Sequence, residues 1–232
     1  MPIAYICKKN IVKFRHAIVL TLLVLLTDQL IKIYVKTHFY MGEEKIPFPF
    51  LPWFRFHFIE NEGMAYGWKL AGSWGKIALT VFRLFAVGFG TYYIMSIIKK
   101  QLHIGYIICV TLIYAGAIGN LIDSLFYGMA FEFSDAYGQN IARGFWQDGF
   151  MGGYEKLLHG RVVDMFYFPI IHDVTLPNWI PVWGGEPFEF FRPVFNLADA
   201  SISIGLICIL IFQTRFFSHR SVEQEVSNHD GE

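Results

Sequence analysis

Residues 104–126 read "IGYIICVTLIYAGAIGNLIDSLF", a long apolar run in which Asp123 is the one charged residue. An α-helix rises about 1.5 Å per residue, so this run covers the roughly 30 Å hydrocarbon core of a bilayer. The whole chain is 54% hydrophobic and only 16% charged, which is more apolar than an ordinary soluble domain. We therefore predict that residues 104–126 form a transmembrane helix.

Three other runs meet the same criterion, at residues 17–35, 77–98 and 196–217. The first follows a basic segment, as in a signal peptide, but has no small-residue cleavage site and is expected to stay attached. Lys and Arg gather before the first run, between the second and third, and after the fourth, so the positive-inside rule places both termini in the cytoplasm. We predict an all-α integral membrane protein with four transmembrane helices.

We interpret residues 1–232 as a single membrane-embedded domain, with a disordered cytoplasmic tail at 218–232. The two long loops then face outward. In the first loop, "WFRFHF" (53–58) alternates aromatic residues with Arg55 and His57, which predicts a strand in a small extracytoplasmic sheet. The second loop is rich in Gly and aromatic residues, and connections of that length are more often functional than inert.

Composition also disfavours several classes of partner and site. The formal net charge is zero, and no long basic stripe is present, so binding to nucleic acid is disfavoured. The three cysteines are at no metal-ligand or disulfide spacing, and no His pair has the spacing of a zinc site. We expect no metal and no cofactor.

Ionisable residues within apolar spans are rare and usually functional. Asp28 and Lys32 are four apart on one helix face and can pair, in either a structural or a substrate-contacting role. Asn120 and Asp123, three apart, also share a face, and a structural role is favoured for them. Arg83 lies in the second span, where snorkelling to the interface and pairing with a carboxylate both stay open.

Asp164 and Asp199 lie at the same predicted depth as the other two acids. Asp164 is in "GRVVDMFYF" (160–168), which is apolar enough to dip into the bilayer surface, and Asp199 begins the last span. If two of the aspartates meet, repulsion and poor solvation make them share one proton. Such a pair can hydrolyse a peptide: one carboxylate activates water, and its protonated partner donates to the carbonyl oxygen.

A structural role is the alternative for Asp199, because Asp commonly caps helix N-termini. Spacing alone does not decide which two of the four aspartates react. An ion-coupled transporter is the rival function, but it needs polar groups near the midplane rather than at one surface. A membrane scaffold is a second rival, and it gives clustered acids no purpose.

Several motifs in family order resemble the lipoprotein signal peptidases (signal peptidase II), in versions with expanded outer loops such as those of Bacteroidetes-type bacteria. They are "TDQLIK" (27–32), "NEGMAYG" (61–67), "GAIGNLID" (116–123), "GRVVDMFYF" (160–168) and "FNLADASISIG" (195–205). The resemblance implies an aspartic endopeptidase of the bacterial inner membrane. It would remove the signal peptide of diacylglyceryl-modified prolipoproteins on the amino side of the lipidated cysteine, near the outer face.

Carried over by motif, the resemblance implies a catalytic dyad of Asp164 and Asp199. The other matched polar residues would support the dyad or bind substrate: Asp28, Lys32, Asn61, Asn120, Asp123 and Asn196. The partners implied are lipid-modified prolipoproteins and membrane lipids, and we expect a monomer.

The chain departs from the family in two respects. Where the family has an arginine after "GNLID", this chain has Ser124, and Arg83, Arg143 and Arg161 are candidate replacements. Insertions at 124–159 and 169–193 lengthen the second outer loop. Their aromatic residues would either rest at the headgroup level or cover the site as a lid: Trp179, Trp183, Phe188 and Phe190.

Overall fold

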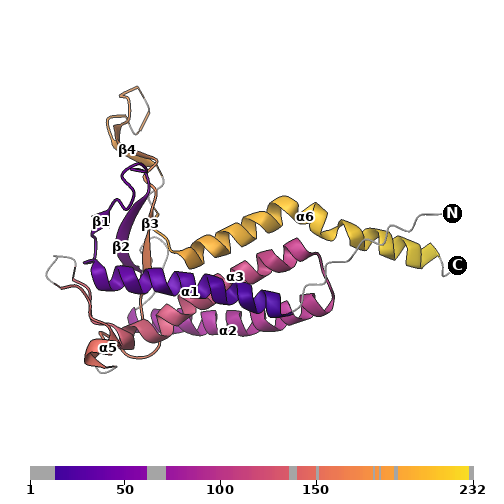
Figure 1. The fold of residues 1–232 in the computed structure, drawn as a ribbon. Coiled ribbons are helices and arrows are strands. Elements are labelled where there is room, and N and C mark those ends of the chain that lie inside the picture. Colours follow the sequence, from indigo (N-terminus) through magenta and orange to yellow (C-terminus); the bar gives the residue numbers. More distant parts are fainter. Residues whose placement is uncertain are drawn as a thin grey trace.

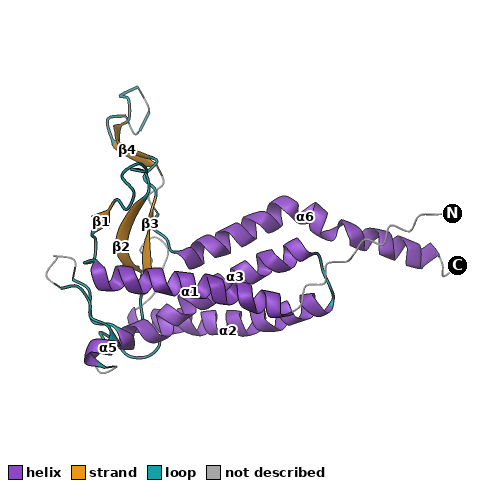
Figure 2. Ribbon diagram, viewed as in Figure 1, coloured by secondary structure: helices purple, strands orange, loops and turns teal. Residues whose placement is uncertain are grey.

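The computed structural model describes residues 14–61, 72–135, 140–149, 152–179, 181–182, 184–190 and 193–229. Four long helices form a bundle (Figure 1, Figure 2), and each is long and apolar enough to cross a membrane. They are α1 (Phe14–His38), α2 (Gly72–Lys99), α3 (Ile104–Ile122) and α6 (Leu197–His229). This confirms the four predicted spans.

Helix α3 is the central helix, since it packs against α1, α2 and α6. Its contact with α6 is close at Gly116, where an added Cβ atom would lie 2.2 Å from the carbonyl oxygen of Ala198. Small residues allow membrane helices to approach in this way. The crossing brings the end of α3 that carries Asn120 beside the first turn of α6.

Beyond Ile122 the third helix widens into a π-helical turn, η2 (Asp123–Tyr127), followed by α4 (Gly128–Ala130). π-turns often occur at functional sites because they redirect side chains at one point of a helix. Gly160 passes close by, since a Cβ atom there would lie 2.0 Å from the carbonyl oxygen of Asp123. The segment around Gly160, which leads into the strand of the second outer loop, is therefore held against the end of α3.

A three-stranded antiparallel sheet covers one end of the bundle. Its order is β1 (Glu44–Lys45), β2 (Arg55–Asn61) and β3 (Val162–Tyr167), with Ile59 opposite Asp164. Strand β2 confirms the strand predicted from alternation, whereas β3 was not predicted. Buried residues including Val35, Phe58 and Met165 form a core that fixes the sheet to α1.

Two further elements lie in the second loop. A short helix, α5, spans Phe145–Asp148, and a separate hairpin is formed by β4 (Ile171–Thr175) and β5 (Pro187–Phe190). The hairpin projects sideways from the sheet end of the bundle (Figure 1). Helix α6 deviates from helical geometry at Phe212 and continues to His229, and the disorder expected of residues 218–232 stays a prediction.

Candidate active site

Two asparagines join Asp164 and Asp199 in the structure. The Nδ2 atom of Asn196 donates to Oδ1 of Asp164 at 2.7 Å, and Nδ2 of Asn120 donates to Oδ1 of Asp199 at 2.7 Å. Nδ2 of Asn196 also donates to Oδ1 of Asn120 at 3.2 Å. A continuous hydrogen-bonded chain therefore runs from one carboxylate to the other.

The start of α6 sets the position of Asp199. Oδ1 of Asn196 accepts from the amide of Asp199 at 2.9 Å, while Oδ2 of Asp199 accepts from the amide of Asn196 at 3.4 Å. This reciprocal pair is a capping box, in which two residues satisfy free backbone donors of the first turn. Asn196 is thus the capping residue, and Asp199 turns its other oxygen toward Asn120.

Strand β3 sets the position of Asp164, whose side chain is buried with only 3% of the residue exposed. Its Oδ2 atom accepts from Nδ2 of Asn61 at 3.2 Å, from the end of the neighbouring strand β2. Burial and, as the second cause, the negative charge of Asp199 together raise the pKa of Asp164 to about 7. Near neutral pH, Asp164 is therefore able both to hold and to release a proton.

A second group, made of buried charged side chains, adjoins Asp164, Asp199 and the two asparagines. Nζ of Lys32 is 2.8 Å from Oδ2 of Asp28 and 2.8 Å from Oδ2 of Asp123, and all three side chains are fully buried. Lys32 also donates to Oδ1 of Asn120 at 3.2 Å. Through that contact the ion-paired group supports the amide that holds Asp199.

Asp28 and Asp123 also accept hydrogen bonds from backbone amides of the two elements that carry Asp199 and Asp164. Oδ1 of Asp28 accepts from the amide of Ala198 at 2.9 Å, and Oδ2 of Asp123 accepts from the amide of Val163 at 3.3 Å. Asp28 thereby fixes the first turn of α6, and Asp123 fixes β3 one residue before Asp164. All the polar residues that sequence analysis singled out within the motifs meet in one network.

Gln29 belongs to the same network and was not singled out from sequence. Its Nε2 atom donates to Oδ1 of Asp123 at 2.9 Å, and its Oε1 atom accepts from the hydroxyl of Tyr127 at 3.0 Å. The available signal was its place inside "TDQLIK", between Asp28 and Lys32. Asn61 is the one part of the "NEGMAYG" motif within the described residues.

Arg83 is the arginine that reaches Ser124, with 2.5 Å between Nη1 and the serine hydroxyl. Its positive charge, within the second span, is attracted by the carboxylates of Asp123, Asp164 and Asp199. The hydrogen bond of Arg83 goes to Ser124, and no ion pair between Arg83 and a carboxylate is found among the described residues, so pairing and snorkelling both stay open. Among the three candidate replacements, Arg83 stands beside the network.

The other two arginines pair with acids elsewhere. Nε of Arg143 is 3.3 Å from Oε2 of Glu132, and Nη1 of Arg161 is 3.5 Å from Oε2 of Glu60. Glu60 also forms a buried ion pair with Lys36. This pair, which sequence analysis did not predict, fastens β2 to α1 beside Asn61.

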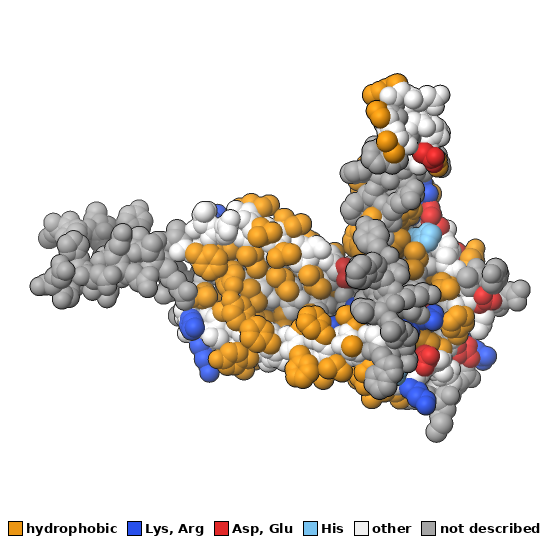
Figure 3. Space-filling view, turned by 180° about the vertical axis from the view of Figure 1, so that it is seen from behind, with side chains coloured by type: hydrophobic (Ala, Val, Ile, Leu, Met, Phe, Trp, Pro, Cys, Tyr) orange, Lys and Arg blue, Asp and Glu red, His pale blue; other side chains and the backbone are white. Residues whose placement is uncertain are grey.

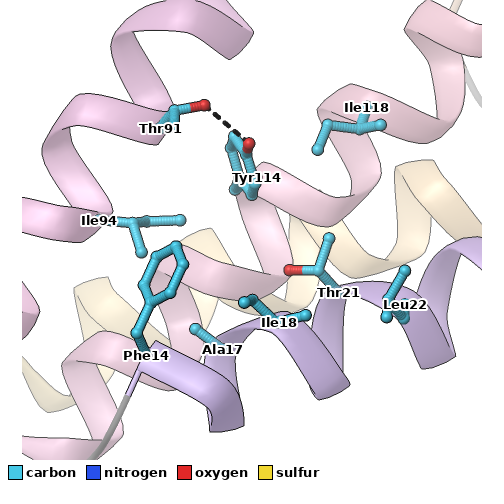
Figure 4. A pocket seen from close by; sticks show the side chains of 9 residues that line it. All are labelled: Phe14, Ala17, Ile18, Thr21, Leu22, Thr91, Ile94, Tyr114 and Ile118. Atoms are coloured by element: carbon cyan, nitrogen blue, oxygen red, sulfur yellow. Dashed lines mark hydrogen bonds between the residues drawn. The ribbon is translucent and has the colours of Figure 1, made fainter.

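An apolar cavity of about 160 Å³ lies between α1, α2 and α3. Figure 4 shows aliphatic and aromatic side chains around it, with a hydrogen bond of 2.7 Å between the hydroxyls of Thr91 and Tyr114. Its lining includes Phe14 and Ala17 near the N-terminal end of α1, whereas the aspartates lie near the other end. The cavity is therefore separate from the candidate site.

Within the described part of the chain, no cluster of three His, Cys, Asp or Glu residues is arranged to hold a metal ion. The independence of the site from metals stays a prediction. The arrangement offers two neighbouring carboxylates, one with a raised pKa, held by neutral amides rather than by cations.

Most of the chain is similar in sequence to known proteins of one family. The model of the family described as "Signal peptidase (SPase) II" matches residues 20–215. A "Lipoprotein signal peptidase" of Porphyromonas gingivalis is 50% identical over 200 residues, which cover 86% of this chain and 83% of that protein. A protein of the same description from Amoebophilus asiaticus is 30% identical over 216 residues, covering 91% and 80%.

A solved structure titled "Bacterial membrane enzyme structure by the in meso method at 2.3 A resolution" has the same fold. It superposes with a TM-score of 0.53 at 21% identity, covering 89% of this chain and 92% of the other. At that identity the likeness concerns the fold alone.

Proposed function

This chain belongs to the signal peptidase (SPase) II family, and we propose that Asp164 and Asp199 are its two catalytic aspartates. As a member of that family it is a membrane aspartic endopeptidase that cleaves the signal peptides of prolipoproteins. The transporter alternative has no support in the comparisons.

The assignment rests on how the four acids of the network are neutralised. Lys32 forms ion pairs with Asp28 and Asp123, so their charges have a fixed partner. Among the described residues, Asp164 and Asp199 have no Lys or Arg within ion-pair distance and are held by amide donors instead. Two neighbouring carboxylates without an ion-paired cation are the pair suited to exchange protons with a substrate.

We assign the acid role to Asp164 and the base role to Asp199, because Asp164 has the raised pKa. Asp199 takes a proton from a water molecule, whose oxygen then bonds to the scissile carbonyl carbon. Asp164 gives its proton to the carbonyl oxygen, which yields a geminal diol. Asp199 next passes its proton to the leaving nitrogen as the C–N bond breaks, and Asp164 recovers the proton from the diol.

The hydrogen bonds around the dyad serve this sequence of proton transfers. Asn196 and Asn120 hold one oxygen of each aspartate, so both carboxylates keep their positions while their charges exchange. Fixed dipoles of this kind stabilise developing charge without having to reorganise during the reaction. Asn61 is placed to hold Asp164 from the opposite side.

The substrate we propose is the diacylglyceryl-modified prolipoprotein, cut on the amino side of the lipidated cysteine. It would enter laterally, with its signal helix beside the spans and its acyl chains still in lipid. The distribution of Lys and Arg supports an active site near the outer face of the inner membrane, with both termini in the cytoplasm. We propose that one copy of the chain suffices for the reaction.

Separate Asp164→Asn and Asp199→Asn substitutions test the dyad. We expect each to abolish cleavage of a lipidated precursor in detergent, read as a gel shift, because Asn neither donates nor accepts the required proton. Glu186→Gln is the matched control, since Glu186 is exposed on the β4–β5 hairpin. Near-normal turnover by either aspartate variant refutes the assignment, and strong inhibition by EDTA argues for a metal.

A further inference from the structure

The hairpin β4–β5 and the loop at its tip form an extension that we call the arm, comprising the described residues 169–179, 181–182 and 184–190. The arm is a two-stranded sheet of its own, separate from β1–β3, and its strands pack mainly on one another. Two-stranded hairpins are marginally stable in water unless another surface supports them. The arm therefore needs a supporting surface.

The exposed surface of the arm is strongly apolar. Trp179 is 80% exposed and Val182 is 88% exposed near the tip. Val174 and Phe188 are directly paired across the two strands, so they lie on one face of the hairpin, and both are exposed. An exposed apolar face of this kind marks a site of contact with another apolar phase.

The direction of the arm matches that of a membrane surface. The four spans fix the membrane normal along the bundle, and the arm runs across that direction from the sheet end of the bundle (Figure 1). In Figure 3 the hydrophobic side chains of the arm gather on the edge turned toward the spans. One acidic group is seen on the other edge, which faces away from the spans.

The base of the arm is fixed by aromatic contacts. The ring of Phe168 lies 6.0 Å from that of Trp53, 5.3 Å from Phe54 and 5.5 Å from Phe195. The loop before β2 continues the apolar surface, since Phe50 is 76% exposed and Trp53 is also exposed. Trp and other aromatic residues are favoured where hydrocarbon meets headgroups.

We propose that the arm lies in the headgroup layer of the bilayer and binds lipid through its apolar edge, with Trp179 and Val182 as anchors. A lid over the dyad is the other interpretation of these aromatic residues, but the arm projects away from the bundle rather than across it (Figure 1). Trp183 lies outside the described residues, and the side chain of Phe190 is not described.

Nitroxide labels at two sites of the arm test the proposal in the full-length protein. We would place single cysteines by Val182→Cys and, as the matched control, Glu186→Cys, after replacing Cys7, Cys109 and Cys208 by Ala and checking that precursor is still cleaved. The protein is placed in nanodiscs of phosphatidylethanolamine and phosphatidylglycerol. Collision rates with O2, which concentrates in lipid, and with water-soluble Ni-EDDA report the depth of each label.

We expect the label at 182 to collide more with O2 than with Ni-EDDA and the label at 186 to show the reverse. Adding Trp179→Ser should shift the label at 182 toward water, because one anchor is lost. Collision with Ni-EDDA at both sites overturns the proposal. So does protection of site 182 from both reagents, since protein rather than lipid would then cover it.

A second measurement keeps all native cysteines. Lipids brominated just below the headgroup quench nearby tryptophans, so Trp179→Phe should reduce the quenched fraction of the emission relative to the wild type. An unchanged quenched fraction contradicts lipid contact at this position.

Discussion

Asp164→Asn is expected to remove activity and at the same time to stabilise the protein above neutral pH. The pKa of Asp164 rises from an ordinary 3.8 to about 7 because the side chain is buried and lies near Asp199. One pKa unit is worth about 1.4 kcal/mol, so ionising this buried group costs the native state about 4 kcal/mol relative to the unfolded chain. The burial that lowers the stability of the native state thus also gives Asp164 a proton that it can donate near neutral pH.

The sign follows from proton counting. Between the two pKa values the native state holds a proton that the unfolded chain has lost, so the free energy of unfolding falls as pH rises through this range and levels off above about pH 7. Asn does not titrate and fits the same space, and the Asn61 amide can turn so that its oxygen accepts. The stability of the variant relative to the wild type should therefore grow by about 4 kcal/mol between about pH 4 and about pH 8.

The assay is thermal unfolding in detergent micelles, followed by tryptophan fluorescence at several pH values. Glu186→Gln removes an exposed carboxylate and should follow the wild-type curve throughout. If Asp164→Asn melts in parallel with the wild type at every pH, or is the less stable protein in alkali, the account of Asp164 as a carboxyl group destabilised by burial is wrong.

Three other perturbations follow from the same contacts. The rate of cleavage should decline above about pH 7 as Asp164 loses its proton. Asn61→Ala should move that decline to higher pH, because the ionised form of Asp164 loses a hydrogen-bond donor. An unshifted pH–rate profile of the Ala variant would contradict this role of Asn61. Lys32→Met leaves two buried carboxylates without their ion-pair partner and should lower the free energy of unfolding by about 3–5 kcal/mol. The control Lys45→Met, at an exposed lysine, should not lower it. Equal melting temperatures of the two variants would count against the buried ion pairs. Arg83→Met should lower kcat/KM about tenfold, because a hydrogen bond from a charged group is worth about 1.5–3 kcal/mol. Arg83→Lys should restore part of the lost kcat/KM. Wild-type kinetics for the Met variant would show that Arg83 has no positioning role.

The spans and the local pairs were predictable because their signals are local. A long apolar run specifies a membrane helix by length alone, and the four-residue spacing of Asp28 and Lys32 specifies a shared helix face. The pair is found at 2.8 Å. The capping relation of Asn196 and Asp199 is equally local: helix capping was the alternative role considered for Asp199, and the structure shows Asn196 and Asp199 capping the first turn of α6 together.

The choice among the acids was not predictable from spacing, because it depends on which carboxylates Lys32 reaches in three dimensions. Strand β3 was missed since Val162, Val163, Asp164 and Met165 are all buried, so the segment lacks the alternation that marks a half-exposed strand. Lys36 was missed for a related reason. A lysine at a helix end normally extends to water, but here the sheet covers it and Glu60 pairs with it.

The ion pair within α1 has a consequence for how the chain enters the membrane during synthesis. Lys32 and Asp28 belong to the same helix, so these two charges can neutralise each other within α1 while the rest of the chain is still being made. Asp123, at the end of α3, arrives later without a basic partner on its own helix, and an unpaired carboxylate is unfavourable at the edge of the hydrocarbon. Capture of α3 by the waiting Lys32 relieves that cost, which couples insertion of the third helix to assembly with the first.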